Sequence, residues 1–136
     1  MKIAKNFEFE SAHRLSDYEG KCERLHGHNY HGHIVVEGEI KDDGIVVDFS
    51  ILKDIITREI KEKLDHRVFL KDTQENHSFF AHIPDDWIVW FNDNPTAENL
   101  AKTLLKRLRL SPTIPSTCRV VSVVLYETPD SFAIAE

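Results

Sequence analysis

Cysteine is scarce in this chain of 136 residues, which contains only Cys22 and Cys118. Two thiols make a poor disulfide framework. The sequence also lacks an uninterrupted apolar run of membrane length, and residues 1–5 lack the apolar run of a signal peptide. We therefore expect a cytoplasmic protein with no membrane span.

Basic residues do not outnumber acidic ones. The chain has 17 Lys and Arg against 23 Asp and Glu, which gives a formal net charge of −6. This balance argues against nucleic acid or an anionic membrane surface as the main partner. A small anionic substrate remains compatible with it, provided that the fold supplies a local basic pocket.

The overall composition is typical of a globular domain, with 41% hydrophobic and 29% charged residues. A chain of this length can bury a real core but is too short to divide comfortably into two. We expect a single domain over residues 1–136.

Periodicity predicts four strands and two helices. Alternation of apolar and polar residues, clearest at Phe7 and Phe9, indicates strands. Apolar residues at helical spacing behind Asp48 and Thr96 indicate helices that these two residues cap. The strands are expected over residues 3–13, 28–40, 119–128 and 132–135, and the helices over 48–64 and 96–108. Residues 45–47 are expected to be extended, and residues 71–94 show only a short β-prone run at 87–91.

This order of elements, ββααββ, is typical of an α+β fold in which two helices cover one face of a four-stranded antiparallel sheet. So small a sheet has two open edges, which invite pairing with another subunit. In the third strand Val121, Val123 and Leu125 alternate with Val120 and Val124, so we expect both faces of that strand to be buried.

Three histidines have the spacing of a metal site. His26 and His28 stand two residues apart, so their side chains leave an extended strand on the same face. His13 can join them if its strand runs antiparallel beside theirs. Three imidazoles with one open position describe a catalytic zinc site. The alternative is a chance His-Gly-His in a chain with eight histidines.

Cys22 is the thiol nearest to this pair of histidines, and its role stays open: it is either a fourth metal ligand or an acid/base beside the metal. His31 and His33 have the opposite strand parity to His28 and are expected on the other face. His77 and His82 are interpreted as ordinary loop histidines.

Two further positions carry candidate chemistry. Asp65 and His66 end the first helix, where a carboxylate beside a histidine can set its proton affinity. The simpler reading is polarity at a helix end, with a favourable cation there. Glu127 stands among apolar strand residues, where a carboxylate needs a donor. It could hold a heterocycle with two N–H groups, or simply lie at an exposed strand end.

Together these residues resemble the 6-pyruvoyl-tetrahydropterin synthase family, and most closely its 6-carboxy-tetrahydropterin synthase branch. The likeness runs in order over nearly the whole chain, and the short spacing from Cys22 to His26 resembles the carboxy-forming branch. Residues 71–94 depart from the compact bacterial members. The motifs that carry the resemblance are Ser11–Leu15, Cys22–Tyr30, Leu64–His66, Pro95–Ala101 and Tyr126–Thr128.

The resemblance implies a tunnelling fold (T-fold), in which subunits close their sheets into a barrel as a trimer or a dimer of trimers. It implies a zinc cofactor on His13, His26 and His28, Cys22 as base and the pair Asp65–His66 as acid/base. Glu127 would anchor the pterin, with Thr96 and Glu98 also contacting substrate. It further implies that zinc-side residues and Glu127 from different subunits combine at an interface.

The implied substrate is 7,8-dihydroneopterin triphosphate. The implied products are 6-carboxy-5,6,7,8-tetrahydropterin, acetaldehyde and triphosphate, on the route to queuosine. Arg14, Lys21, Arg24 and Arg67 are candidates for binding the triphosphate by position alone. Two alternatives stay open: an enzyme that forms 6-pyruvoyl-tetrahydropterin, and a non-catalytic module in which zinc only stabilises an assembly.

Overall fold

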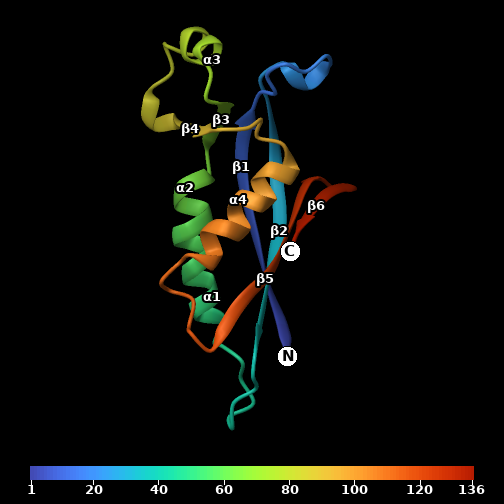
Figure 1. Ribbon diagram of the computed structural model, residues 1–136, viewed down its shortest axis with the longest axis vertical. Coiled ribbons are helices and arrows are strands. Elements are labelled where there is room, and N and C mark those ends of the chain that lie inside the picture. Colours follow the sequence, from blue (N-terminus) through green and yellow to red (C-terminus); the bar gives the residue numbers. More distant parts are fainter.

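The computed structural model describes residues 1–136, which form one mixed sheet and a layer of helices (Figure 1). The strands are β1 (Lys2–His13), β2 (His26–Gly38), β3 (Arg67–Lys71), β4 (Ile88–Phe91), β5 (Cys118–Thr128) and β6 (Ser131–Ala135). The α-helices are α1 (Phe49–Ile56), α2 (Glu62–Leu64), α3 (Gln74–Phe79) and α4 (Ala97–Arg109). A π-helical turn, η2 (Thr57–Lys61), joins α1 to α2, and short 3₁₀ helices occur at η1 (Lys21–Glu23) and η3 (Asp85–Trp87).

The sheet order is β4-β3-β1-β2-β5-β6. The antiparallel strands β1, β2, β5 and β6 are those predicted from the sequence. The sheet nevertheless has six strands instead of four, because β3 pairs in parallel with the end of β1 and β4 pairs in parallel with β3. Both added strands have only four or five residues; β4 corresponds to the β-prone run noted at 87–91, whereas β3 was too short for periodicity to identify.

The apolar residues of the strands and those of the helices pack together in one core. Phe7, Phe9, Tyr30 and Ile34 point from β1 and β2 into the layer occupied by the helices, where α1 and α4 bury their leucine and isoleucine stripes. Both predicted caps are confirmed: a side-chain oxygen of Asp48 accepts from the Ser50 amide at 2.7 Å, and that of Thr96 accepts from the Asn99 amide at 3.3 Å. The α+β prediction with helices on one face is therefore correct.

Two local expectations were wrong. Residues 45–47 form no strand: Val46 and Val47 lie in a bend and are buried. In β5 the pairing passes from Val35–Ser122 to Val36–Val120, so Val121 is an extra residue in a β-bulge. The bulge reverses the alternation, and Val120 therefore joins Val123 and Leu125 on the core face instead of opposing them. Val124, on the other face, is also buried, so the expected burial of both faces is confirmed.

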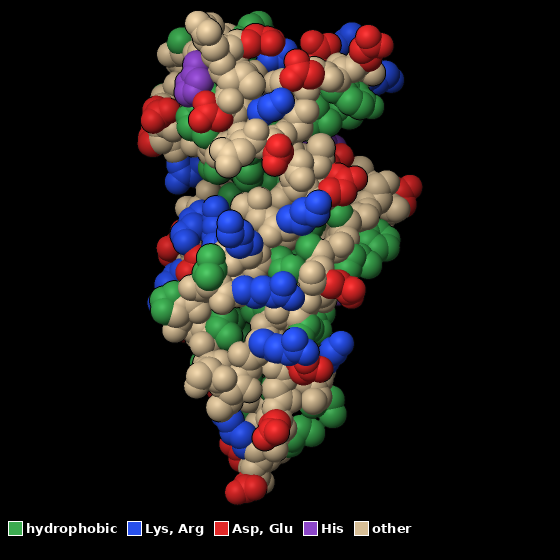
Figure 2. Space-filling model, viewed as in Figure 1, with side chains coloured by type: hydrophobic (Ala, Val, Ile, Leu, Met, Phe, Trp, Pro, Cys, Tyr) green, Lys and Arg blue, Asp and Glu red, His purple; other side chains and the backbone are tan.

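Only Ser11–His13 of β1 pair with β3, so the rest of that edge of β1 carries no strand, and β6 leaves the opposite edge of the sheet open. Figure 2 shows Lys and Arg side chains along the face covered by the helices, with Asp and Glu more frequent towards the end that carries α3 and η1. None of the helices is both long and apolar enough to cross a membrane.

Candidate metal centre and its surroundings

The antiparallel pairing of β1 with β2 brings the three predicted histidines together. His13 pairs directly with His26, and His28 follows two residues later on the same face. One ring nitrogen from each of His13, His26 and His28 falls in a group whose members all lie within 4.8 Å of one another. The rings meet edge-on, with centroids 4.5–5.0 Å apart. This arrangement could hold one metal ion.

Backbone carbonyls fix the orientation of two of these rings. Nδ1 of His13 lies 2.8 Å from the Pro95 carbonyl, and Nδ1 of His26 lies 2.6 Å from the Arg24 carbonyl. Because a carbonyl can only accept, each Nδ1 carries the proton and each Nε2 presents a lone pair. The two Nε2 atoms are 3.0 Å apart. With both rings neutral, two lone pairs face each other, an arrangement that a shared cation stabilises.

His28 provides an independent test of fit. Its Nε2 atom is buried and has no hydrogen-bond partner. A buried polar atom without a partner costs free energy unless a ligand completes it. The residues present therefore fit a metal bound through three imidazole nitrogens.

The proton affinities also suit metal binding, which requires neutral imidazoles. Burial lowers the pKa of His13 to about 4; the Pro95 carbonyl opposes this shift, and the neighbouring His26 and His28 add to it. Burial also lowers the pKa of His28, against the opposing charge of Glu127.

Glu127 and Tyr30 complete the surroundings of the histidines. Oε1 of Glu127 lies 3.5 Å from Nε2 of His28, and its side chain keeps 25% of its surface exposed. The Tyr30 hydroxyl lies 3.3 Å from Nδ1 of His13. Burial, followed by the charge of Glu127, raises the pKa of Tyr30 well above its ordinary value, so the phenol stays protonated. Glu127 is therefore partly buried beside the histidines, and it does not lie at an exposed strand end.

Cys22 lies in η1 and is half-buried. It is not a member of the group of close ligand atoms, which contains the three histidines alone. Its carbonyl accepts a 3.0 Å hydrogen bond from the Leu15 amide, which closes the loop between β1 and β2. The structure therefore does not place Cys22 among these potential ligands, and its role as an acid/base stays a prediction.

Asp65 and His66 form a pair in contact, with Oδ2 of Asp65 2.9 Å from Nδ1 of His66. The turn is docked on Glu10, whose amide donates to Asp65 at 2.9 Å and whose carbonyl accepts from the His66 amide at 2.7 Å. These bonds hold His66 at φ 57°, an unusual value for a residue other than glycine. The Glu10 side chain, 3.9 Å from the His66 ring, points to the face opposite Phe9 and His13. Within one chain the Asp65–His66 pair is thus separated from the face that carries the three histidines.

A shallow cavity of about 450 Å³ lies beside the Asp65–His66 turn, and both His66 and His28 contribute to its lining. Small residues, Ala12 and Gly27, contribute to its lining between them. The cavity therefore reaches from His66 to the strand that carries His26 and His28.

Other predicted residues have partners of their own. Thr96 caps α4, and hydrogen bonds from the Glu98 amide and then from Thr96 lower the pKa of Glu98. Their predicted contact with substrate stays a prediction. Arg14 is bonded to Asn76 and Glu75, and Arg67 donates to the Asp86 carbonyl. Lys21 and Arg24 are exposed, and a role for any of these basic residues in binding a triphosphate stays a prediction.

The secondary histidines divide into two groups. His31 is exposed and His33 half-buried, both at positions that alternate with the buried Tyr30 and Ile34, as predicted. Loop histidine His77 is instead part of α3, where it contacts Asp72 at 2.7 Å. Neither His77 nor His82 belongs to a group of potential metal ligands.

Sequence reasoning missed the residues that orient the histidines. Tyr30 shares the strand parity of His26 and His28, and that parity was the available signal. Pro95 stands 82 residues from His13, and no local pattern links a carbonyl to a ring at that distance along the chain.

An α+β protein with a three-histidine site on adjacent antiparallel strands is the class that the fold and the site define. The chain belongs to the 6-pyruvoyl tetrahydropterin synthase family, whose model matches residues 2–136. A 6-carboxy-5,6,7,8-tetrahydropterin synthase from Rickettsia conorii is 33% identical over 134 residues, which cover 97% of each chain.

Solved structures agree on the fold. An uncharacterized protein from Wolinella succinogenes superposes with a TM-score of 0.83 at 27% identity, over 99% of this chain and 97% of the other. A 6-pyruvoyl tetrahydropterin synthase from Plasmodium falciparum has a TM-score of 0.77 at 24% identity, over 99% and 96% of the two chains. The fold is the T-fold of this family.

Proposed function

We propose that this protein is a zinc-dependent 6-carboxy-5,6,7,8-tetrahydropterin synthase of the cytoplasm. It would convert 7,8-dihydroneopterin triphosphate to 6-carboxy-5,6,7,8-tetrahydropterin with release of acetaldehyde and triphosphate, a step towards queuosine. The observation that carries the proposal is the buried, unpartnered Nε2 of His28 between two oriented histidines and Glu127. The name of the Rickettsia conorii relative supports the choice of product.

His13, His26 and His28 would hold the metal through their Nε2 atoms. Bound there, zinc would supply a Lewis acid for oxygens of the substrate side chain. The backbone carbonyls of Pro95 and Arg24 keep two of the rings in the tautomer that binding requires.

The other steps belong to the chain's own residues. Cys22 would remove a proton from a side-chain carbon, since a thiol near a cation has a lowered proton affinity. His66, with Nδ1 held by Asp65, would return protons through Nε2. Glu127 would accept two N–H groups of the pterin, and such charge-assisted bonds are stronger than neutral ones.

The proposed enzyme is a homo-oligomer, a trimer or a dimer of trimers. Two observations support a site shared between subunits. The sheet has open edges at β1 and β6. The Asp65–His66 pair lies on the opposite side of the sheet from the three histidines of its own chain.

Product analysis tests the proposal. Zinc-loaded protein is incubated with 7,8-dihydroneopterin triphosphate, and the pterins are identified by mass spectrometry. We expect the 6-carboxy product and acetaldehyde, with neither formed by His28→Ala protein. Accumulation of 6-pyruvoyl-tetrahydropterin would support the alternative that the family model's description suggests. No product from a well-folded, zinc-loaded protein would instead favour a non-catalytic assembly module.

A further inference from the structure

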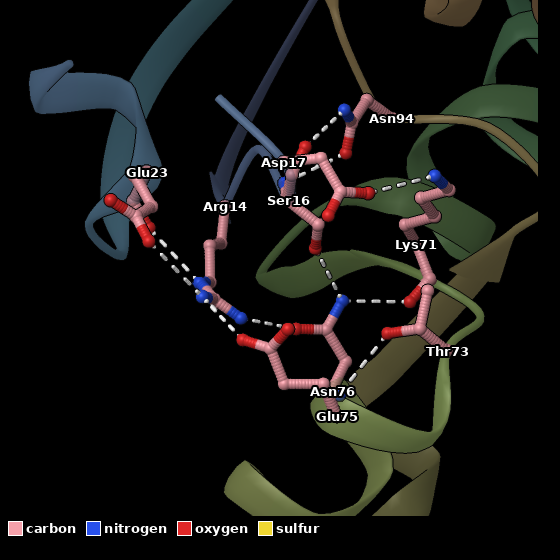
Figure 3. Close-up of polar contacts among 9 residues, drawn as sticks. All are labelled: Arg14, Ser16, Asp17, Glu23, Lys71, Thr73, Glu75, Asn76 and Asn94. Atoms are coloured by element: carbon pink, nitrogen blue, oxygen red, sulfur yellow. Dashed lines mark hydrogen bonds and ion pairs between the residues drawn. The ribbon is translucent and has the colours of Figure 1, made fainter. Parts of the chain in front are cut away.

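A polar network, buried at Arg14 and Asn76, joins the loop that carries Cys22 to the segment 71–94 (Figure 3). Arg14, directly after β1, is at its centre, with only 11% of its side chain exposed. Its Nη1 atom donates to Oδ1 of Asn76 at 2.6 Å, and Nη2 donates to Glu75 at 2.8 Å. Its Nε atom donates to the Glu23 carbonyl at 3.0 Å, so one guanidinium holds both segments.

Asn76 is fully buried, and every polar atom of its side chain is used. Oδ1 accepts from Arg14, and Nδ2 donates to the Ser16 hydroxyl at 3.0 Å and to the Lys71 carbonyl at 2.8 Å. The backbone amide of Asn76 donates to the Thr73 hydroxyl at 3.2 Å, which caps the N-terminus of α3. Fully satisfied buried networks of this kind fix one geometry, because any displacement leaves a buried group unpaired.

The same segment is attached to the loop a second time at its other end. Asn94 accepts from the Ser16 amide at 2.8 Å and donates to the Ser16 carbonyl at 2.6 Å. The next residue, Pro95, supplies the carbonyl that orients His13. Segment 71–94 is therefore anchored both to the Cys22 loop and to the backbone beside a metal ligand.

Within the loop, these anchors lie on either side of Cys22. The Cys22 carbonyl is bonded to the Leu15 amide, and Arg14 holds Glu23, the residue after Cys22. Arg24 follows and supplies the carbonyl bonded to His26. A shift of Arg14 would therefore move the thiol relative to the three histidines.

We propose that Asn76 and Arg14 are positioning residues that hold Cys22 at its working place beside the metal centre, which gives segment 71–94 its role. The expected effect on catalysis rests on the proposed function; the expected effect on the position of the loop does not. Neither side chain is hydrogen-bonded to a histidine; they act through the carbonyl of Glu23 and through Ser16. Arg14 is accordingly assigned to the loop and not to the triphosphate.

Hydrogen exchange and steady-state kinetics of Asn76→Ala test the proposal. We expect amides of residues 15–24 to exchange about tenfold faster than in the wild type, as for the loss of one or two net hydrogen bonds. Trypsin should cut faster after Lys21 and Arg24. We expect kcat to fall about 10- to 100-fold, the scale of a small misplacement of a reacting group, with KM changed much less.

His77→Ala is the matched control in the same helix. His77 is about half exposed and contacts Asp72 and the Trp90 ring, but not Arg14. In the His77→Ala protein, the amide exchange of residues 15–24 and kcat should match those of the wild type. Asn76→Asp still accepts from Arg14 but sets a carboxylate oxygen against the Lys71 carbonyl, so amides of residues 15–24 should again exchange faster than in the wild type. If Asn76→Ala does not fold, Arg14→Met removes the same contact from the loop side, together with the cation–π contact of the guanidinium with Phe79.

Unchanged exchange in residues 15–24, or fast exchange with unchanged kcat, would overturn the proposal. A wild-type protein that forms no pterin product would refute the proposed function instead. In that case the rate at which iodoacetamide modifies Cys22 in the metal-free wild-type and Asn76→Ala proteins tests whether the network positions Cys22. Release of the loop should raise the rate at the half-buried Cys22 several-fold relative to Cys118, which lies outside the network. An unchanged ratio of the two rates would count against it.

Discussion

Oε1 of Glu127 lies 3.5 Å from Nε2 of His28 within the same chain. The two residues come from β5 and β2, which are neighbours in the sheet, so their proximity is a property of a single subunit. This contradicts the expectation that Glu127 and the zinc side of the site come from different subunits. If the site is shared between subunits, the part supplied by the neighbour is more reasonably Asp65–His66, which lies on the other side of the sheet.

We predict about one zinc per chain, bound by the three histidines. His28→Ala should lose most of this zinc, because one of three ligand atoms is removed and the other two lone pairs remain unbridged. Metal analysis after dialysis checks the result. Glu127→Ala is the matched control: it lies beside His28 but outside the ligand group, and it should keep its zinc. Full zinc retention in both His26→Ala and His28→Ala would refute the site.

We predict that Cys22→Ala keeps its zinc and its fold while turnover falls by about 100- to 10,000-fold, the usual range for loss of a general base. The reason is that Cys22 lies outside the group of ligand atoms. Zinc content, thermal unfolding and kcat measured on one preparation test this. Zinc loss would make Cys22 a fourth ligand, and unchanged turnover would remove it from the mechanism.

We predict that inactive Cys22→Ala and His66→Ala proteins, mixed, dissociated and reassembled, recover part of the activity. Some interfaces then combine an intact Cys22 from one subunit with an intact Asp65–His66 pair from the next. The control mixture, Cys22→Ala with Glu127→Ala, should recover little, because Glu127 lies beside a metal ligand of its own chain. Equal recovery in both mixtures contradicts this arrangement, as does a fully active monomer in analytical ultracentrifugation.

We predict that Asp65 stabilises the fold in a pH-dependent way. The hydrogen bond from the Glu10 amide, and then His66, lower the pKa of Asp65. A carboxyl group whose pKa is lowered by folding contributes stability above its unfolded pKa of about 3.9, and this contribution is lost as pH falls through the folded pKa.

Urea unfolding of wild-type and Asp65→Asn protein from pH 7 down to pH 2.5 measures this contribution. The variant should be less stable at neutral pH by about 0.5–1 kcal/mol, a small value because the carboxylate is partly exposed and screened. The difference should shrink below about pH 3.9. A difference that stays constant over the whole range would contradict the assignment.

Local pattern predicted much of the fold. Alternation placed Phe7, Phe9 and His13 on one face of β1, and His26 and His28 on one face of β2. The sequence also predicted the caps at Asp48 and Thr96 and the apolar stripes of the helices that follow them. These features depend on residues close in sequence, where the periods of strand and helix act directly. The possible metal ligands were predictable for the same reason, once β1 and β2 were taken to be antiparallel.

Only the tertiary structure decided the remainder. Strand β3 was not predicted, and β4 was visible only as a β-prone run at 87–91, because each is stabilised by its neighbour in the sheet and not by its own pattern. The bulge at Val121 reversed an alternation that the sequence alone presents as regular. The Pro95 carbonyl reaches His13 across 82 residues, and Asn76 reaches Arg14 across 62. Such contacts join single polar atoms that happen to be brought within 3 Å by packing elsewhere, so no repeating pattern in the chain marks them.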